Sequence, residues 1–401
     1  MKGLFLNLPM TGHINPTLDL VQALVKSGDE IHYWCGKDFQ NSIEASGAAF
    51  FSYSIEIEAI DPRKKMSGVE YLTYLSDISL RLLQKHIKEW SEAGYDYVIT
   101  DSCLVVGKII AEYLGIPGVT STTTFSFSEK MLRTPSAISS AILSLFVQHR
   151  KWADWRRLRK KISSDYQVKL EMLDVFTSPQ DLNLTYTSSY FQPMLKTLDL
   201  KKNKFIGPLL KRQEAKESMD LDVLAKKTVI YISLGTVYNL KPEFFLNCIK
   251  AYEARKNTVL LLSIGQHIPR SSLPEDSESL RIYRVIPQLA VLPFVDLFIC
   301  HGGMNSVNEA MYHKVPVMIF PQQDEQMLVA KRVAALGAGI NMGRPIAEPT
   351  DIRRSGDRIL SSTKYQENAA KIAESFNGAE GAAGGVNLIH QYVKSNAFSC
   401  H

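Results

Sequence analysis

The stretch FICHGGMNSVNEAMYHKVPVMIFPQQDEQ, residues 298–326, places two apolar runs on either side of a polar, glycine-containing segment. The first run ends at His301 and a pair of glycines, and a helix is predicted from Asn305. The second apolar run, 315–320, leads to an acid and an amide. Strands that alternate with helices in this way are typical of a parallel, doubly wound sheet.

The same alternation covers most of the 401 residues and falls into two series. Strands are predicted at 3–8, 30–35, 48–54, 95–101, 117–123, 183–187 and 204–210, and again at 228–235, 258–265, 296–300 and 315–320. The charged stretch 211–227 has no apolar periodicity and is the predicted linker. We therefore expect an α/β protein with a first domain over 1–210 and a second over 228–395, and we leave open that the last helix packs back on the first domain.

The amino-acid composition is typical of an ordinary globular protein. Apolar residues make up 45% and charged residues 22%, and a net charge of +5 on this length does not indicate nucleic-acid binding. The five cysteines have no metal or redox spacing, which favours a reducing compartment. The N-terminal apolar run is short and interrupted by Asn7, unlike a signal peptide, and no run of about 18 apolar residues occurs. We expect a cytoplasmic protein without stable membrane insertion.

The segment HRKWADWRRLRKK, 149–161, is strongly basic and contains Trp152 and Trp155. A basic amphipathic helix of this kind can lie on a membrane surface. A solvated helix face with both tryptophans turned inward is the alternative, and it is the one that charge runs more often represent.

The turn after the first strand of the quoted stretch has the features of an anion-binding site. Gly302 and Gly303 allow the backbone to approach a ligand closely. The helix that starts near Asn305 directs free N–H groups and the positive end of its dipole at the same point, which favours a phosphate or pyrophosphate. Taken alone, a glycine pair before a helix is also typical of a plain strand-to-helix turn with a cap.

Polar side chains around this turn could bind the phosphates, the ribose and the sugar of a nucleotide sugar. His301 and Ser306 could donate to phosphate oxygens, and Glu309, one helical turn further on, could accept from two ribose hydroxyls. Glu325 and Gln326 are predicted to end the next strand, where a carboxylate beside an amide suits a sugar. The predicted cleft-facing positions of these residues favour a ligand site over a plain turn.

In the first domain, His13 follows the first strand and Asp101 ends the strand at 95–101. Carboxyl ends of parallel strands share one edge of the sheet, so the two side chains can meet. An aspartate that accepts from one imidazole nitrogen leaves the other able to take a proton from a hydroxyl. Taken alone, a strand-end histidine is more often structural. Thr123 and Thr124 end another strand at the same edge, and either contact a sugar or phosphate or begin a polar loop.

Residues 285–326 closely resemble the donor-binding signature of the UDP-glycosyltransferases, most strongly that of the bacterial macrolide-type branch. The resemblance extends over nearly the whole chain, because it also includes TGHINP (11–16), TDSCLVVGKIIAEYLGIP (100–117), FIGPLL (205–210) and SLGT (233–236). It implies a GT-B fold, in which two facing Rossmann-like domains enclose an interdomain cleft. It also implies that the N-terminal domain binds the acceptor and the C-terminal domain binds the nucleotide sugar.

By motif position, the resemblance implies roles for individual residues. His13 would be the catalytic base and Asp101 its orienting partner. The donor-binding residues would be Thr123, Thr124, Thr236, Val285, Ile286, Gln288, His301, Gly303, Asn305, Ser306, Glu309, Glu325 and Gln326. Fixed dipoles would stabilise the leaving phosphate, so neither a metal nor a cofactor is expected beside the UDP-sugar.

One position departs from the family pattern. Many members have a tryptophan that stacks on uracil where this chain has Val285. Main-chain groups at Val285 and Ile286 could still bond the uracil edge. We therefore predict looser discrimination between nucleotide bases.

Together these features predict an inverting, metal-independent glycosyltransferase. It would move a hexose, with glucose implied by the resemblance alone, from a UDP-sugar to a hydroxyl of a small aromatic or polyketide- or macrolide-like acceptor. The alternatives are a cell-wall-type N-acetylglucosamine transferase, a sugar-nucleotide epimerase on the same fold, and a non-catalytic nucleotide-sugar-binding protein. The acceptor pocket would fall in the stretches 55–90 and 125–180, which do not identify the acceptor, and family precedent favours a monomer.

Overall fold

The computed structural model describes residues 1–57, 66–132, 148–210, 224, 226–235 and 241–397. The chain divides into two compact units, one formed by Met1–Leu209 with Ala379–His401 and the other by Leu210–Gly378. Of the predicted linker, residues 211–223 and 225 lie outside the described residues.

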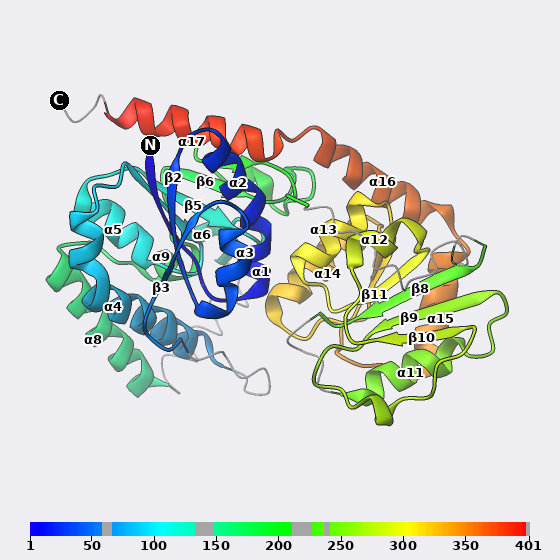
Figure 1. Cartoon of the computed structure of the whole chain (residues 1–401). Coiled ribbons are helices and arrows are strands. Elements are labelled where there is room, and N and C mark those ends of the chain that lie inside the picture. Colours follow the sequence, from blue (N-terminus) through cyan, green and yellow to red (C-terminus); the bar gives the residue numbers. More distant parts are fainter. Residues whose placement is uncertain (58–65, 133–147, 211–223, 225, 236–240, 398–401) are drawn as a thin grey trace. The chain divides into compact units, whose positions relative to one another are not determined.

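The first unit is built on a seven-stranded parallel sheet with the order β3-β2-β1-β4-β5-β6-β7 (Figure 1). The strands are β1 (Lys2–Leu6), β2 (Glu30–Cys35), β3 (Ala49–Ser52), β4 (Tyr97–Asp101), β5 (Gly118–Thr122), β6 (Leu182–Thr185) and β7 (Asn203–Phe205). All seven strands predicted for this part of the chain are present. The strands β2 and β3 lie on one side of β1, and β4 lies on its other side. The topological switch point is therefore between β1 and β4.

Helices cover both faces of this sheet because alternate strand residues point to opposite sides. Leu4 and Leu6 pack in a core that includes residues of α4 (Gly68–Glu92), α5 (Val106–Leu114), α8 (His149–Tyr166) and α9 (Met172–Thr177). Phe5, between them, packs in the opposite core with residues of α2 (Leu18–Lys26), α3 (Gln40–Glu44) and α17 (Gly381–Ala397). The short helices α1 (Thr11–Ile14) and α6 (Glu129–Leu132) follow β1 and β5.

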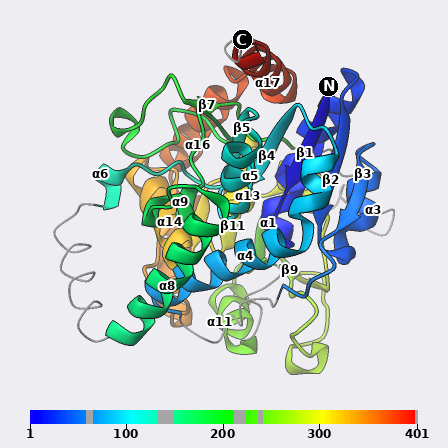
Figure 2. The same ribbon diagram turned by 90° about the vertical axis from the view of Figure 1, so that its left-hand side faces the viewer.

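The basic segment predicted at 149–161 lies in α8, which packs alongside α4 (Figure 2). Trp155 is buried and Trp152 is half-buried, and both belong to the core between these helices and the sheet. Arg156, Arg157 and Lys160 are exposed on the other side of the helix. The tryptophans therefore face inward, as the solvated-face interpretation expects.

The second unit holds a six-stranded parallel sheet with the order β10-β9-β8-β11-β12-β13. Its strands are β8 (Thr228–Ser233), β9 (Thr258–Ser263), β10 (Leu280–Tyr283), β11 (Leu297–Cys300), β12 (Val317–Ile319) and β13 (Gly339–Asn341). Its helices are α11 (Pro242–Tyr252), α12 (Gln288–Val291), α13 (Met304–Tyr312), α14 (Asp324–Ala335), α15 (Pro349–Leu360) and α16 (Thr363–Asn377). The switch point lies between β8 and β11, so the predicted doubly wound architecture is confirmed for both units.

The last helix, α17, belongs to the first unit. Val386, Ile389 and Val393 are buried in the core beside α2, and a Cβ on Gly385 would lie 2.9 Å from the Leu20 side chain. The second domain expected from the sequence extends to about residue 395, whereas the second unit ends at Gly378.

None of the helices in the part of the chain that the structure describes combines the length and apolar character needed to cross a membrane.

Candidate active site

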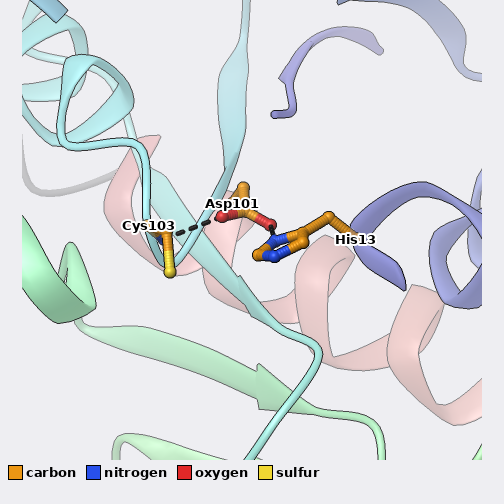
Figure 3. Close-up of side chains that lie close together, drawn as sticks. All are labelled: His13, Asp101 and Cys103. Atoms are coloured by element: carbon orange, nitrogen blue, oxygen red, sulfur yellow. Dashed lines mark hydrogen bonds and ion pairs between the residues drawn. The ribbon is translucent and has the colours of Figure 1, made fainter. Parts of the chain in front are cut away.

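His13 and Asp101 meet at the switch point of the first sheet. His13 lies in α1, just after β1, and Asp101 is the last residue of β4. The Nδ1 atom of His13 lies 2.6 Å from Oδ2 of Asp101, and the other carboxylate oxygen accepts the Cys103 backbone N–H at 2.7 Å (Figure 3). Asp101 is fully buried, whereas 21% of the His13 side chain is exposed. A carboxylate at Nδ1 favours the tautomer with its proton there, which leaves the Nε2 lone pair able to accept a proton.

A buried polar network holds the backbone that carries His13. Asn7 is fully buried, and its Nδ2 donates to the His13 carbonyl at 3.1 Å and to the Tyr33 hydroxyl at 2.7 Å. The Tyr33 hydroxyl also bonds Thr17, whose Oγ1 donates to the Ile14 carbonyl. Two consecutive carbonyls of α1 are therefore fixed by side chains. The sequence carries one signal for this role, the lone amide that interrupts the first apolar run.

Thr123 and Thr124 follow β5, whose neighbour in the sheet is β4. Thr123 is 6% exposed. The Thr124 hydroxyl is buried and has no hydrogen-bond partner among the described residues. A buried hydroxyl without a partner is costly, so this oxygen is available to a ligand that reaches it.

In the second unit, His301 follows β11 at the switch point next to the end of β8. Its ring lies between two glycines. A Cβ on Gly235 would lie 2.7 Å from the ring, and a Cβ on Gly303 would lie 2.5 Å from Nε2. Burial lowers the pKa of His301 to about 4, and its buried Nδ1 has no partner in the described part of the chain. His301 is therefore neutral at neutral pH, and its ring could bind a ligand through hydrogen bonds but not through charge.

The helix α13 begins at Met304, after the two glycines that follow this histidine, and its N-cap residue Gly303 has no side chain to cap it. Asn305 and Ser306 are half-buried in its first turn. The predicted helix start is thus confirmed to within one residue. Thr236, which also belongs to the predicted donor site, lies outside the described residues.

Glu309 and Gln288 connect α13 to α12. The Gln288 Nε2 atom donates to Glu309 Oε2 at 2.6 Å. Burial raises the pKa of Glu309 to about 7, against a smaller lowering by the Gln288 hydrogen bond. Nearby, Ile286 is buried, whereas the Val285 side chain is 60% exposed.

The prediction that Glu325 and Gln326 end a strand is wrong. The strand β12 ends at Ile319, and both residues lie in the first turn of α14. Pro321 cannot donate to a strand ladder, and Asp324 and Glu325 favour a helix start. Glu325 is exposed, whereas Gln326 is 4% exposed and its Oε1 accepts the Gln322 backbone N–H at 2.8 Å.

Comparisons with known proteins identify the family of the chain. Residues 254–381 match the family described as erythromycin biosynthesis protein CIII-like, C-terminal domain. The chain is 31% identical over 388 residues to the NDP-glycosyltransferase YjiC of Bacillus licheniformis, with 94% of each chain covered. It is 30% identical over 377 residues to a Bacillus subtilis protein named UDP-glucosyltransferase YdhE, with 93% of each covered.

A solved structure has the same fold over nearly the whole chain. The glycosyltransferase of kitacinnamycin superposes with a TM-score of 0.85 at 22% identity, with 98% of both chains covered. Two parallel-sheet α/β units of this kind constitute the GT-B fold. The chain therefore belongs to the UDP-glycosyltransferase superfamily, in its bacterial macrolide-type branch, and is a glycosyltransferase.

Proposed function

We propose that this enzyme moves a hexose, with glucose as the first candidate, from a UDP-sugar to a hydroxyl of a small aromatic or polyketide- or macrolide-like acceptor, with inversion at the anomeric carbon. The observation that carries the proposal is the 2.6 Å contact between His13 and Asp101 at the carboxyl edge of the first sheet. Two relatives named for UDP-glucose or NDP-sugar transfer support the donor class.

In the proposed reaction, His13 is the general base. Its Nε2 takes the proton of the acceptor hydroxyl as the acceptor oxygen forms a bond to the anomeric carbon. The bond from that carbon to the phosphate oxygen breaks on the opposite face, and UDP leaves. The buried Asp101 carboxylate stabilises the imidazolium that forms, and base assistance of this kind contributes roughly 10²- to 10⁴-fold in rate.

The second unit is proposed to bind the donor. The N-terminus of α13 and the neutral His301 would bind the phosphates through N–H groups. Glu309, oriented by Gln288, would accept from the ribose hydroxyls, and main-chain groups at Ile286 would meet the base. Because these dipoles are fixed, we propose that no metal cofactor is required.

We propose that Glu325, more than Gln326, contacts the transferred sugar. The Glu325 carboxylate is exposed at the start of α14. The Gln326 side chain is buried, and its Oε1 atom already accepts the Gln322 backbone N–H. None of the four cysteines in the described residues forms a disulfide, which supports a reducing, cytoplasmic setting. A monomer stays a prediction.

The base assignment is tested with His13→Ala. We expect transfer to fall at least about 100-fold, since base assistance is lost, whereas UDP affinity measured by calorimetry stays unchanged. An acceptor panel with UDP-glucose, analysed by mass spectrometry, identifies the product, and the anomeric proton coupling reports inversion. Unchanged transfer by the variant would refute the assignment, and turnover of the UDP-sugar without any acceptor would favour the epimerase alternative.

A further inference from the structure

A thiol lies beside the proposed catalytic pair. Ligand atoms of His13, Asp101 and Cys103 all lie within 4.8 Å of one another (Figure 3). The three residues come from α1, from the end of β4 and from the turn that follows β4. Asp101 is fully buried, and the other two are half-buried. An imidazole nitrogen, a carboxylate oxygen and a thiolate sulfur are ligands that Zn²⁺ binds in proteins.

We propose that a thiophilic divalent cation such as Zn²⁺ binds Nδ1 of His13, the Asp101 carboxylate and Sγ of Cys103, and thereby inhibits the enzyme. The inhibition rests on the proposed function, whereas the binding site does not. A water would complete four-coordination, as at other zinc sites with three protein ligands. Mg²⁺, which prefers oxygen ligands in octahedral geometry, does not fit this set.

The charges and protons of the loaded site balance. The Cys103 thiol loses one proton to solvent on binding. Its thiolate and the Asp101 carboxylate together carry two negative charges, which neutralise the divalent cation. A neutral assembly matters here because the carboxylate is fully buried, where an uncompensated charge is costly.

Metal binding would stop His13 from acting as a base, because it would change which ring nitrogen carries the proton. In the metal-free site the His13 Nδ1 proton faces Asp101, and the lone pair is on Nε2. A metal on Nδ1 requires the lone pair there, so the ring proton moves to Nε2. The nitrogen that would accept the acceptor's proton is then already protonated, and transfer stops.

The geometry requires only a small side-chain adjustment. Zn–S bonds are about 2.3 Å long and Zn–N bonds about 2.0 Å, so the ligand atoms of a tetrahedral zinc site lie roughly 3–4 Å from one another. The His13 Nδ1 and Asp101 Oδ2 atoms, now 2.6 Å apart, would have to separate into this range to admit the metal, and rotation of the Cys103 side chain would bring Sγ, now within 4.8 Å of them, into the same range. The other three cysteines of the described chain are fully buried, and burial raises the pKa of Cys35 and of Cys300 to about 12. Cys103 is thus the accessible thiol among them.

The site is tested first without any activity measurement. Co²⁺ is added to full-length, tag-free protein reduced with a phosphine, and thiolate-to-cobalt charge-transfer absorption is recorded in the near ultraviolet. We expect the band in wild type and in the control C248A, and its loss in C103A, which keeps the backbone N–H that Asp101 accepts. If C103A does not fold, C103S takes its place. A wild-type protein without the band, or a variant that retains it, would overturn the site.

Inhibition is tested in the transfer assay by titrating Zn²⁺ and, separately, Mg²⁺. We expect Zn²⁺ to inhibit reversibly on addition of a chelator and C103A to need at least about tenfold more Zn²⁺, relative to its own metal-free rate. Equal Zn²⁺ sensitivity of C103A and wild type would overturn the inhibition. A cobalt band without transfer to any acceptor would instead refute the proposed function and leave the metal site standing.

Discussion

Glu309 is the residue whose ionisation most directly reports on the proposed ribose site. Its pKa is raised from 4.5 to about 7 by burial, so the folded protein holds this proton more tightly than the unfolded chain does. The resulting stabilisation is complete below pH about 4.5 and is lost as the pH rises through about 7. The loss amounts to at most about 3 kcal/mol of unfolding free energy.

We expect Glu309→Gln to remove this part of the pH dependence, because the amide cannot ionise. Denaturant unfolding between pH 4.5 and 8 measures it, with the exposed Glu325→Gln as a matched control that should follow wild type. Ribose hydroxyls donate to the carboxylate form, so UDP affinity should also strengthen across the same window. A Glu309→Gln protein with the wild-type slope would show that another group is responsible.

Val285 offers no aromatic face to a nucleotide base, and its side chain is 60% exposed. We expect initial rates with UDP-glucose and TDP-glucose to differ little. Val285→Trp should tighten UDP binding, because one base stacked on an aromatic ring contributes about 1–3 kcal/mol. Val285→Leu, which adds apolar surface without a ring, is the control. A preference of several hundredfold for UDP in wild type would contradict this prediction.

The contact between His13 and Asp101, the proposed catalytic pair, could be predicted from the sequence, whereas the environment of Glu309 could not. His13 and Asp101 follow two strands of one parallel sheet, and the shared edge brings them together whatever the surrounding loops do. The raised pKa of Glu309 depends on burial against α12, and the placement of Gln326 depends on a backbone N–H of its own turn. The ends of strands along the chain can be predicted from a sequence, but burial and local turn bonds cannot.

At the scale of elements, α1 has four residues and is followed without a break by a 3-10 turn, Asn15–Thr17, and then by α2. Asn7 and Thr17 bond two consecutive carbonyls of α1 through the network with Tyr33. These side-chain bonds fix the backbone of α1 at the point where the helical geometry changes to the tighter 3-10 turn. The orientation of His13 therefore depends on Asn7.

We expect Asn7→Ala to lower the unfolding free energy by about 1–3 kcal/mol, because it leaves buried polar groups unpaired. It should also lower kcat for transfer while the KM for the donor changes little, since the proposed donor-binding residues lie mainly in the second unit. Steady-state kinetics and denaturation measure the two effects. The exposed Asn41→Ala should change neither, and an Asn7→Ala enzyme with wild-type kcat would contradict the positioning role.

The strands that the sequence did not predict are the two edge strands of the second sheet. The strand β10 contains Arg281 between apolar residues, and β13 has three residues, one of them glycine. Edge strands pair on one side only and are often short and half-exposed, so they lack the continuous apolar run of central strands such as β8 and β9. Their place in the sheet follows from pairing with neighbours far along the chain.

At the scale of the molecule, the chain leaves the first unit, builds the second and returns. The C-terminal helix α17 is attached to the first unit in part through Asp29. The Asp29 carboxylate accepts from the N-terminal ammonium at 3.1 Å, from Tyr97 at 2.7 Å and from His390 of α17 at 2.9 Å. A fragment that stops at residue 210 would expose the apolar face that Val386, Ile389 and Val393 cover. The first unit is therefore incomplete without the last helix.

Burial alone would raise the pKa of Asp29, but the hydrogen bonds from Tyr97, His390 and the N-terminus outweigh it and lower the pKa below the usual 3.8. The stabilisation from this carboxylate is therefore present above pH about 4 and is lost as the pH falls through the lowered pKa. We expect Asp29→Asn to reduce the unfolding free energy by about 2 kcal/mol or more at pH 7, because the buried network loses its negative charge and one of its two acceptor oxygens becomes a donor NH2. The difference from wild type should shrink in acid.

His390→Ala tests the same contact from the other side, and it should speed hydrogen exchange in α17 more than elsewhere in the first unit. Lys394→Ala, an exposed change in the same helix, is the matched control and should leave exchange as in wild type. If the amides of α17 exchange equally slowly in His390→Ala and in Lys394→Ala, then apolar packing on α2 alone holds the helix. In that case Asp29 would stabilise the N-terminus and Tyr97 but not α17.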